Sequence, residues 1–379
     1  SQVTSSDSLC SIYEQVASVL KDHGMKQKKD DKGRFHLVLG GKNGSGIPFK
    51  RFAQLFKWDY GITPHCNFFR GFIWYHKREK MIQVLRGYSN ETGWDADSHV
   101  PESFLFFPDS AEDSELDKFR VAFESSTKRS RDNIWILKPS ETTRTEKVQV
   151  KDDFDEIMSY IQSKERAVPY VIQRYISNPL LLPGNRKFDL RYFCLIDHKL
   201  QAYIFPEGIC RSCSSEYNMD NLCDQFAHLS SKKVQRKHKD FGAFEKNNEM
   251  STEQFAKWYS AEFGESFDRQ VAPQVKEIMA RVVNSGKSKL ENVGHADYSA
   301  FQLFAFDFLL DKESKVWFLE ANATPEIHQT LTTEMANDIV EIAIKPIFED
   351  LMGKASPKNI KRFEPLYEDE LVSCNGNKK

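Results

Sequence analysis

The sequence has no apolar run long enough to cross a bilayer and no secretory leader, so we expect neither a membrane partner nor export. Its 7 cysteines are odd in number and scattered along 379 residues, a pattern that does not suit a disulfide framework. We therefore expect free thiols in a reducing compartment and predict a cytoplasmic protein. The formal net charge of −2 lacks the basic excess of bulk nucleic-acid binders, so we expect no nucleic acid partner.

Two motifs are incomplete. Cys210 and Cys213 have the spacing of a zinc or redox pair, with Cys223 and His228 downstream. Because no second close pair completes a metal site, a functional thiol site is the less favoured interpretation. Residues 40–46 are rich in glycine but lack the Gly-Lys-Ser/Thr ending of a phosphate loop, so we interpret them as a plain turn.

Local charge is uneven although the total is balanced. Basic residues gather at 26–29, 128–131 and 232–239, and acidic residues gather around 368–370. Each basic run is either a solvated face or part of a lane for an acidic partner, and the sequence leaves both interpretations open.

The composition is that of a globular protein, with 40% hydrophobic and 28% charged residues and 29 phenylalanines in short apolar runs. A chain of 379 residues exceeds what one core usually organises, so two or three subdomains are expected. Strands mixed with helices favour an α+β, or mixed α/β, fold. The predicted strands are 35–39, 104–107, 134–137, 170–174, 188–196, 200–205, 301–310 and 316–320, and the predicted helices are 9–20, 154–163, 252–263, 270–284 and 335–351, with loops at 89–98 and 109–115.

The last two predicted strands form a hairpin with a loop of about four residues. On that pairing Asp307 lies opposite Phe318 and diagonal to Glu320, while Glu320 and Asn322 share one face. Buried carboxylates this close repel each other unless a cation joins them. Mg²⁺ prefers such oxygen ligands, so we predict a magnesium site; the alternative is that the carboxylates point to solvent from an edge strand.

A charged stripe runs along an earlier strand. Lys187, Asp189 and Arg191 project to one face of it, while the intervening apolar residues project to the other and can fill a core. Lysine offers a point charge for phosphate, and arginine offers a planar fork for carboxylate or phosphate oxygens. The stripe therefore lines either a polar cleft or a merely solvated strand face.

Two further strand ends suit a nucleotide. Lys138 ends the apolar strand that starts at Ile134, where an amine can reach a phosphate. Residues 173–176 end another strand before Asn178, and their backbone groups are placed to contact an adenine edge. Combined with the predicted metal hairpin, these features predict ATP held between two sheets.

Several of these stretches resemble the tubulin–tyrosine ligase family. The run from Val171 to Arg191 (VIQRYISNPLLLPGNRKFDLR) is similar to its central signature, and 301–308 and 317–322 resemble its metal-binding strands. The likeness spans roughly residues 35–351. Its N-terminal part, similar to the tyrosine-adding ligase more than to relatives that add glutamate or glycine, lies at 34–40, 47–49, 67–71 and 101–104.

The resemblance implies an ATP-grasp fold and the addition of tyrosine to the C-terminal carboxylate of detyrosinated α-tubulin through an acyl-phosphate. The implied cofactors are ATP and Mg²⁺. The implied partners are free tyrosine and the α/β-tubulin dimer with its acidic α-tubulin tail, with the ligase itself a monomer. The implied parts are an N-terminal α/β domain (1–72), a central ATP-grasp domain (73–183), a C-terminal catalytic domain (184–355) and a flexible tail (356–379).

The resemblance also implies roles for individual residues. The implied catalytic residues are Arg191, Arg211 and Lys187, of which Arg191 and Arg211 would bind phosphate or the substrate carboxylate. Arg78 lies near the place of another family lysine. The nucleotide would contact Lys138, Gln173, Arg174, Tyr175, Ile176, Lys187, Asp189 and Ser230, the metal would be held by Asp307, Glu320 and Asn322, and the tail would be guided by Lys232, Lys233, Arg236, Lys237 and Lys239.

The chain departs from the family pattern in two places. The loop after Lys138 lacks the family's glycine, and Ser231 stands where the family has asparagine. Glycine loss restricts the close approach of backbone to phosphate. Two alternatives therefore remain: a catalytically impaired relative that binds tubulin, and a family ligase that adds another amino acid such as glutamate.

Overall fold

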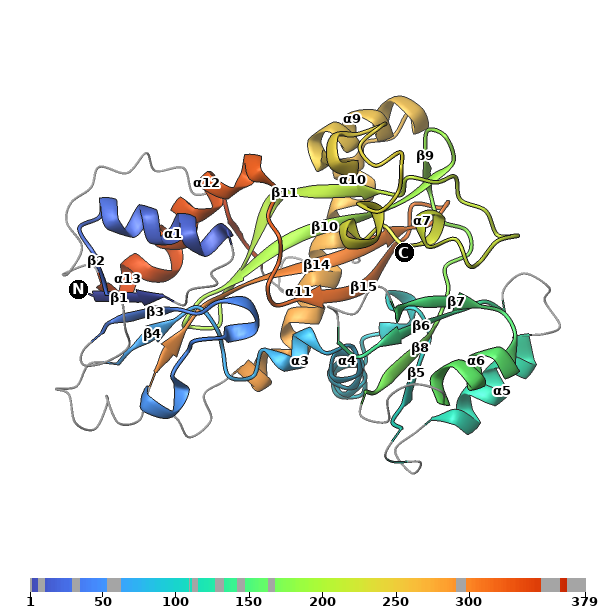
Figure 1. Ribbon diagram of the computed structural model, residues 1–379, viewed down its shortest axis with the longest axis horizontal. Coiled ribbons are helices and arrows are strands. Elements are labelled where there is room, and N and C mark those ends of the chain that lie inside the picture. Colours follow the sequence, from blue (N-terminus) through green and yellow to red (C-terminus); the bar gives the residue numbers. More distant parts are fainter. Residues whose placement is uncertain are drawn as a thin grey trace, which may run out of the picture.

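The computed structural model describes residues 2–5, 11–28, 35–52, 63–108, 110, 115–126, 133–141, 147–162, 168–290, 298–348 and 362–366. Three β-sheets organise these residues, and Figure 1 shows the largest running across the middle of the molecule between the other two. We call them the large sheet, the small sheet and the N-terminal sheet. Within the described ranges, no helix combines the length and apolarity that crossing a lipid bilayer requires.

The large sheet has the strand order β12-β11-β10-β14-β15, with β9 added to β10 and β16 to β11. All its pairings are antiparallel. Every residue of β14 is buried, because a central strand rich in Phe and Leu is covered on both faces. The strands are β9 (Leu181–Leu182), β10 (Arg186–Ile196), β11 (Ala202–Ser212), β12 (Glu249–Ser251), β14 (Gln302–Leu310), β15 (Val316–Asn322) and β16 (Glu364–Pro365).

Helices pack on one face of the large sheet. On β10, Phe188 and Leu190 point into a core shared with α9 (Thr252–Phe263) and α11 (Ala272–Leu290). The α9 helix begins at a capping box between Ser251 and Gln254 and ends before a left-handed glycine, as its sequence dictates. The charged stripe of β10 is consequently left for the other face.

The small sheet is antiparallel, in the order β5-β8-β6-β7. Trp135 is fully buried and packs edge-on against Phe119, so α5 and α6 cover one face. The elements are β5 (Ser103–Phe106), α5 (Leu116–Ser126), β6 (Trp135–Pro139), β7 (Gln149–Lys151), α6 (Phe154–Gln162) and β8 (Tyr170–Arg174).

The N-terminal sheet has the order β13-β4-β3-β1-β2 with parallel pairings, so it takes one strand from the last third of the chain. Its helix α1 packs on α12, which continues through a π-helical turn into α13. The elements are β1 (Gln2–Ser5), α1 (Ser11–Asp22), β2 (Lys26–Lys28), β3 (Leu37–Leu39), β4 (His65–Cys66), β13 (Ser299–Ala300), α12 (Gln329–Ile339), the π-turn η5 (Val340–Ile344) and α13 (Lys345–Phe348).

Some elements differ from the sequence prediction. Helix α4 (Arg78–Thr92) was not predicted, and the loop predicted at 89–98 is wrong for its first four residues, which belong to this helix. Within the predicted tail, residues 362–366 instead contribute β16. The remaining short elements are η1 (Lys42–Gly44), α3 (Ile73–His76), η2 (Ala96–Ser98), α7 (Gln225–His228), α8 (Lys232–Gln235), η4 (Lys246–Asn248) and α10 (Phe267–Gln270).

Candidate functional site

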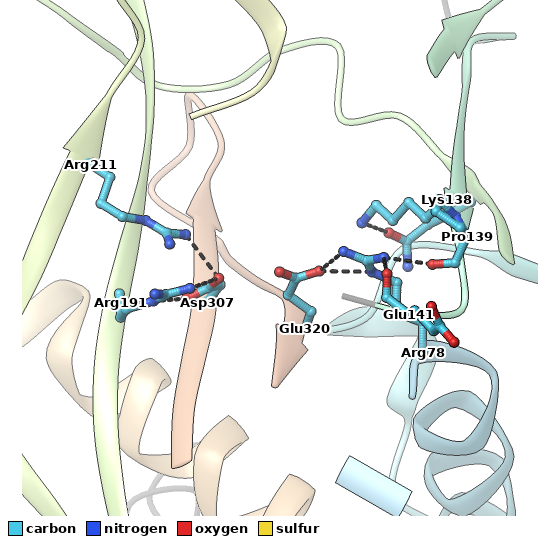
Figure 2. A network of polar contacts seen from close by, with 9 residues as sticks. Arg78, Lys138, Pro139, Glu141, Arg191, Arg211, Asp307 and Glu320 are labelled. Carbon is cyan, nitrogen blue, oxygen red and sulfur yellow. Dashed lines mark hydrogen bonds and ion pairs between the residues drawn. The ribbon is translucent and has the colours of Figure 1, made fainter. Parts of the chain in front are cut away.

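A cavity of about 320 Å³ lies between the large sheet and the small sheet. Figure 2 shows several of its polar side chains, with Arg191, Arg211 and Asp307 on the left, Glu320 in the middle, and Lys138 and Arg78 on the right. Eight of the residues predicted to act in catalysis or to bind the nucleotide or the metal line it: Lys138, Asp189, Arg191, Arg211, Ser230, Asp307, Glu320 and Asn322.

Asp307 on β14 is held by two arginines. Arg191 on β10 donates from Nε to Oδ1 at 2.7 Å and from Nη2 to Oδ2 at 2.8 Å, and Arg211 on β11 reaches Oδ2 at 2.8 Å. Burial raises the pKa of Asp307, but the two guanidinium groups outweigh burial and lower it to about 2. Asp307 is therefore an ionised carboxylate held in one orientation.

Arg211 joins Asp307 to a second carboxylate, Asp189. Its Nε donates to Asp189 Oδ1 at 2.6 Å, and the Ser230 hydroxyl donates to Oδ2 of the same carboxylate. Burial, with help from nearby Asp307, raises the pKa of Asp189 even though Arg211 opposes it. The charged strand predicted from the sequence thus lies in a polar cleft, and the solvated-face alternative is wrong for Asp189 and Arg191.

Glu320 on β15 faces Arg78, the first residue of α4. Arg78 donates to Glu320 Oε2 from Nε at 2.8 Å and from Nη2 at 2.5 Å. Its Nη1 donates to the carbonyls of Pro139 at 2.6 Å and Glu141 at 3.2 Å. One side chain therefore joins the large sheet to the start of the loop after Lys138, as Figure 2 shows.

The predicted register of the β14–β15 hairpin is wrong by one residue near the turn, where Leu310 pairs with Val316, and by two residues at Asp307. A β-bulge between Asp307 and Phe308 places Asp307 opposite Glu320, and Phe308 opposite Phe318. The extra residue, Leu319, keeps Phe318 in the core while Glu320 and Asn322 line the cavity. The bulge brings the two carboxylates closer in the strand pairing than the predicted diagonal. β15 does lie at the edge of the large sheet, but the alternative of carboxylates that point to solvent is wrong, because Asp307 is buried and Glu320 pairs with Arg78.

Lys138 is the cation of the small-sheet wall. Its Nζ donates to Gln173 Oε1 at 2.6 Å, and Gln173 in turn donates to the Ser103 hydroxyl at 2.9 Å. Burial lowers the pKa of Lys138 to about 7, because a neutral carboxamide compensates an ammonium poorly. An anion in the cavity would raise that pKa again.

Lys187 turns toward an aromatic cluster at one end of the charged strand. Its Nζ donates to the Tyr175 hydroxyl at 2.7 Å, and that hydroxyl lies 2.8 Å from His228 Nδ1. Burial lowers the pKa of Lys187 to about 8. Lys187 therefore shares a network with Tyr175, on the adenine side of the predicted nucleotide site.

Two of the residues predicted to contact adenine, Arg174 and Tyr175, also make contacts that stabilise the small sheet. The Arg174 guanidinium pairs with Glu102 at 2.5 Å and lies over the Trp135 ring, 4.3 Å from its centroid. The backbone N–H of Tyr175 donates to the carbonyl of Ile134. The side chain of Arg174 is thus engaged away from the cavity, and a contact of Arg174 with a nucleotide would have to come from its backbone.

The cavity mouth carries basic groups that extend beyond the sequence prediction. Of the five residues with the implied tail-guiding role, Lys232, Lys233 and Arg236 line the cavity, whereas Lys237 and Lys239 do not. Lys42 lines it too, although the glycine-rich segment was interpreted only as a plain turn. The turn is fixed by Asn43, whose backbone N–H donates to the hydroxyl of Thr324, another residue that lines the cavity. A lysine in a glycine-rich turn was the signal that the sequence offered.

The departures from the family pattern are partly visible. Ser231 caps α8 and lines the cavity, whereas residues 142–146 of the glycine-poor loop lie outside the described ranges. The thiol alternative fails, because burial raises the pKa of Cys213 to about 12 and also raises that of Cys210. Both thiols are therefore inert side chains of the core.

The donor set fits a hard divalent cation. Asp307 and Glu320 present carboxylate oxygens to the cavity, and Asn322 adds a carboxamide. Among the described residues, no group of three or more His, Cys, Asp or Glu side chains stands at metal-binding spacing. The carboxamide is accordingly the natural third oxygen donor, and water and phosphate would complete the shell.

Comparison with known proteins supports the resemblance. The model of the tubulin-tyrosine ligase family matches residues 60–356. The chain is 32% identical to tubulin glycylase 3B of Tetrahymena thermophila over 251 residues, covering 64% of this chain and 21% of that protein. It is 28% identical to tubulin monoglutamylase TTLL4 of Mus musculus over 313 residues, covering 76% and 24%. It is 27% identical to the probable tubulin polyglutamylase ttll-9 of Caenorhabditis elegans over 215 residues, covering 55% and 50%.

The chain thus spans between about a fifth and a half of the length of these relatives. The family match nevertheless covers most of the 379 residues and includes both sheets that enclose the cavity. With its mixed α/β, ATP-grasp-like fold, the chain belongs to the tubulin-tyrosine ligase family.

Proposed function

We propose that this protein is an ATP- and Mg²⁺-dependent ligase that joins an amino acid to a carboxylate of a tubulin tail. The observation that carries the proposal is the opposed pair Asp307 and Glu320, each held by arginine, across a cavity from Lys138. A ligase that makes an acyl-phosphate needs cations and fixed geometry around phosphoryl oxygens more than it needs a nucleophilic side chain.

The amino acid we propose is glutamate or glycine. The relatives reported above are named as glycylases and glutamylases, and the predicted tyrosine finds no support among them. The N-terminal segments that resemble the tyrosine ligase do not outweigh this, because no described residue of these segments lines the cavity. Lys42, which does line it, lies just beyond one of them.

The roles of the chain's own residues follow from their geometry. Asp307, Glu320 and Asn322 would hold Mg²⁺, which when bound draws charge from phosphate oxygens. Lys138 would contact the phosphates, and Arg78 would keep the loop after it beside Glu320. Fixed side chains of this kind lower a barrier by needing no reorganisation during the reaction.

The carboxylate substrates would meet arginine on the large-sheet wall. Arg211 and Arg191 offer planar donors beside the carboxylates that already fix them. The tubulin tail, an acidic segment, would approach over Lys232, Lys233 and Arg236 at the mouth. We propose that the enzyme acts as a monomer on the α/β-tubulin dimer.

The test is incorporation of labelled amino acid. The protein would be incubated with ATP, Mg²⁺, tubulin, and one of labelled glutamate, glycine or tyrosine. We expect label from glutamate or glycine on a tubulin chain, loss of label with Glu320→Gln, and full label with the exposed-site control Lys257→Ala. Label from tyrosine alone would restore the tyrosine ligase prediction.

A second candidate function has its own support. The arginines already neutralise both carboxylates, and the loop after Lys138 is poor in glycine. A catalytically impaired relative that still binds tubulin would give no label with any amino acid. Its tubulin binding would be unchanged by Asp307→Ala.

A further inference from the structure

Residues 362–366 form a short extended segment on the edge of the large sheet, far along the chain from the strand that they join. Tyr203 of β11 pairs with Pro365, and Ile204 pairs with Glu364. The N–H of Leu366 donates to the carbonyl of Ala202 at 2.9 Å. Because Pro365 has no N–H, it suits an edge position and stops further strands from adding there.

The aromatic residue of this segment is its anchor. Phe363 is 5% exposed and packs edge-on against Phe205, with ring centroids 5.0 Å apart. Asp338 on α12 accepts the backbone N–H groups of Arg362 at 2.6 Å and Phe363 at 3.1 Å through the same Oδ2 atom. One carboxylate therefore fixes the backbone immediately beside the buried ring.

The charged side chains on either side of the anchor also have specific partners. Arg362 pairs with Glu207 at 3.1 Å and with Glu334 of α12. On the other side, Glu364 pairs with Lys276 of α11 at 2.8 Å. Basic Arg362 therefore has acidic partners, and acidic Glu364 has a basic partner. This order of charges favours one direction of the segment along the sheet edge.

Two cavities flank the segment. One, of about 290 Å³, is lined by Pro365 and Leu366 together with α11 residues; the other, of about 350 Å³, is lined by Phe363 and Pro365 together with Glu341 and Pro346. The segment therefore lies along a groove that is hollowed on both sides and touches α11, α12 and β11 at once. Within the part of the chain that the structure describes, the hydrogen bonds and ion pairs of the segment involve no residue of the candidate functional site.

We propose that β11, α11 and α12 form a peptide-docking groove, and that residues 362–366 are its ligand, bound within the same chain but exchangeable for the same sequence in a separate peptide. The groove would accept an extended segment with the order basic, aromatic, acidic, proline, apolar. Addition of a strand to a sheet edge, with one buried aromatic anchor, is how many peptide-binding domains work. The resident segment is favoured because its tether gives it a high local concentration.

The experiment uses the full chain with its anchor removed. A fluorescent peptide of residues 360–368 would be titrated into wild type and into Phe363→Ala, with binding read as fluorescence anisotropy. We expect the peptide to bind Phe363→Ala at least about tenfold more tightly, because the tethered competitor is weakened. A peptide whose phenylalanine is replaced by alanine should not bind either protein.

Matched controls separate docking from general loosening. Phe244→Ala removes a phenylalanine that is 59% exposed and lies outside the groove, and it should bind the peptide no better than wild type. Adding Lys276→Glu to Phe363→Ala should weaken binding, and a peptide carrying Glu364→Lys should recover it.

Equal peptide affinity for wild type and Phe363→Ala, with the variant still folded by circular dichroism, would overturn the proposal. If Phe363→Ala does not fold, Arg362→Ala replaces it, because that change spares the buried ring. The decisive measurement is then binding of the Glu364→Lys peptide to the variant that also carries Lys276→Glu. If that peptide does not recover binding, the proposed docking groove is contradicted. Ligase activity enters none of these measurements.

Discussion

The two walls of the cavity handle buried charge in opposite ways. On the large-sheet wall, Asp307 has two guanidinium partners, and its pKa falls to about 2. On the small-sheet wall, Lys138 has a neutral carboxamide for a partner, and burial brings its pKa down to about 7. The first wall is electrostatically complete by itself, whereas the second is completed only by an anion.

This contrast assigns different tasks to the walls. A carboxylate fixed by arginines presents the same charge and geometry before and during a reaction, which is the requirement for preorganised catalysis. An amine that gains charge when an anion arrives couples binding to proton uptake. The predictions below break or sharpen this contrast, in order of decreasing effect.

The largest effect is expected from Asp307→Ala. It leaves the largely buried Arg191 without its carboxylate partner and leaves Arg211 with Asp189 alone, and an uncompensated buried charge typically costs about 3–5 kcal/mol of unfolding free energy. Urea denaturation followed by fluorescence would measure the loss. The control is Glu253→Ala, which breaks an exposed pair on α9 and should leave the unfolding midpoint almost unchanged. Equal losses of stability in the two variants would refute the interpretation that the large-sheet wall is electrostatically complete.

Lys138→Met should weaken nucleotide binding without destabilising the folded protein. It replaces a desolvated amine by an apolar side chain of similar length, so the folded state should be no less stable at neutral pH. Nucleotide affinity should fall by about 1.5–3 kcal/mol, the usual contribution of a hydrogen bond to a charged group. Thermal stabilisation by ATP with Mg²⁺ would report the affinity, and a large loss of stability without ligand would contradict the assignment.

The pH dependence of binding should distinguish the two walls. Lys138 has its pKa lowered to about 7, so a bound anion that raises it draws in a proton above that pH. Nucleotide affinity should therefore weaken as pH rises from 7 to 8, by at most about 1.4 kcal/mol per pH unit. Lys138→Met should remove this dependence of nucleotide affinity on pH. A pH dependence that wild type and Lys138→Met share would come from the nucleotide or from another group.

The stability that the large-sheet wall contributes has the opposite pH dependence, because it is lost as pH falls. The folded pKa of Asp307 is depressed to about 2, so its contribution is present above the unfolded value near 4 and is lost as pH falls toward 2. Acid unfolding monitored between pH 5 and 2 should begin at higher pH in Arg191→Ala than in wild type. Coincident acid transitions would argue against Arg191 as the stabilising partner.

The smallest effect is expected at the mouth. Lys42 is exposed, so Lys42→Ala should weaken binding of an acidic tubulin-tail peptide by only about two- to fivefold at low salt. Because exposed charges are screened, the difference should shrink as salt is raised. Equal weakening at low and high salt would instead place Lys42 in direct, desolvated contact with the peptide.

The sequence was most informative where local signals and tertiary packing agree. Strand β8 and helix α9 have the predicted bounds, because a short buried run that starts at Tyr170 defines the first and a capping box with a terminal glycine defines the second. Helix α4 was missed because Gly87 and a polar stretch at its end weaken its pattern. Its Arg78 acts through a tertiary contact with Glu320, which sequence spacing does not encode.

The site residues were also predicted unevenly. Alternation along β10 correctly placed Asp189 and Arg191 on the cavity face. The assumed pairing of Leu310 with Lys315 gave the wrong partner for Asp307, because Leu310 pairs with Val316 and a bulge then inserts Leu319. No residue in that strand signals either shift. The guanidinium partners of Asp307 come from two other strands, so only the fold could pair them.

The shared construction of the N-terminal sheet has a consequence for biosynthesis. Strand β4 ends at Cys66, and its neighbour β13 begins at Ser299, 233 residues later (299 − 66). At roughly 5–20 residues per second, the ribosome needs about 10–50 s to supply the missing strand. During that interval the edge of β4 has no β13 to pair with, and an unpaired strand edge is where a nascent chain is open to pairing with other chains.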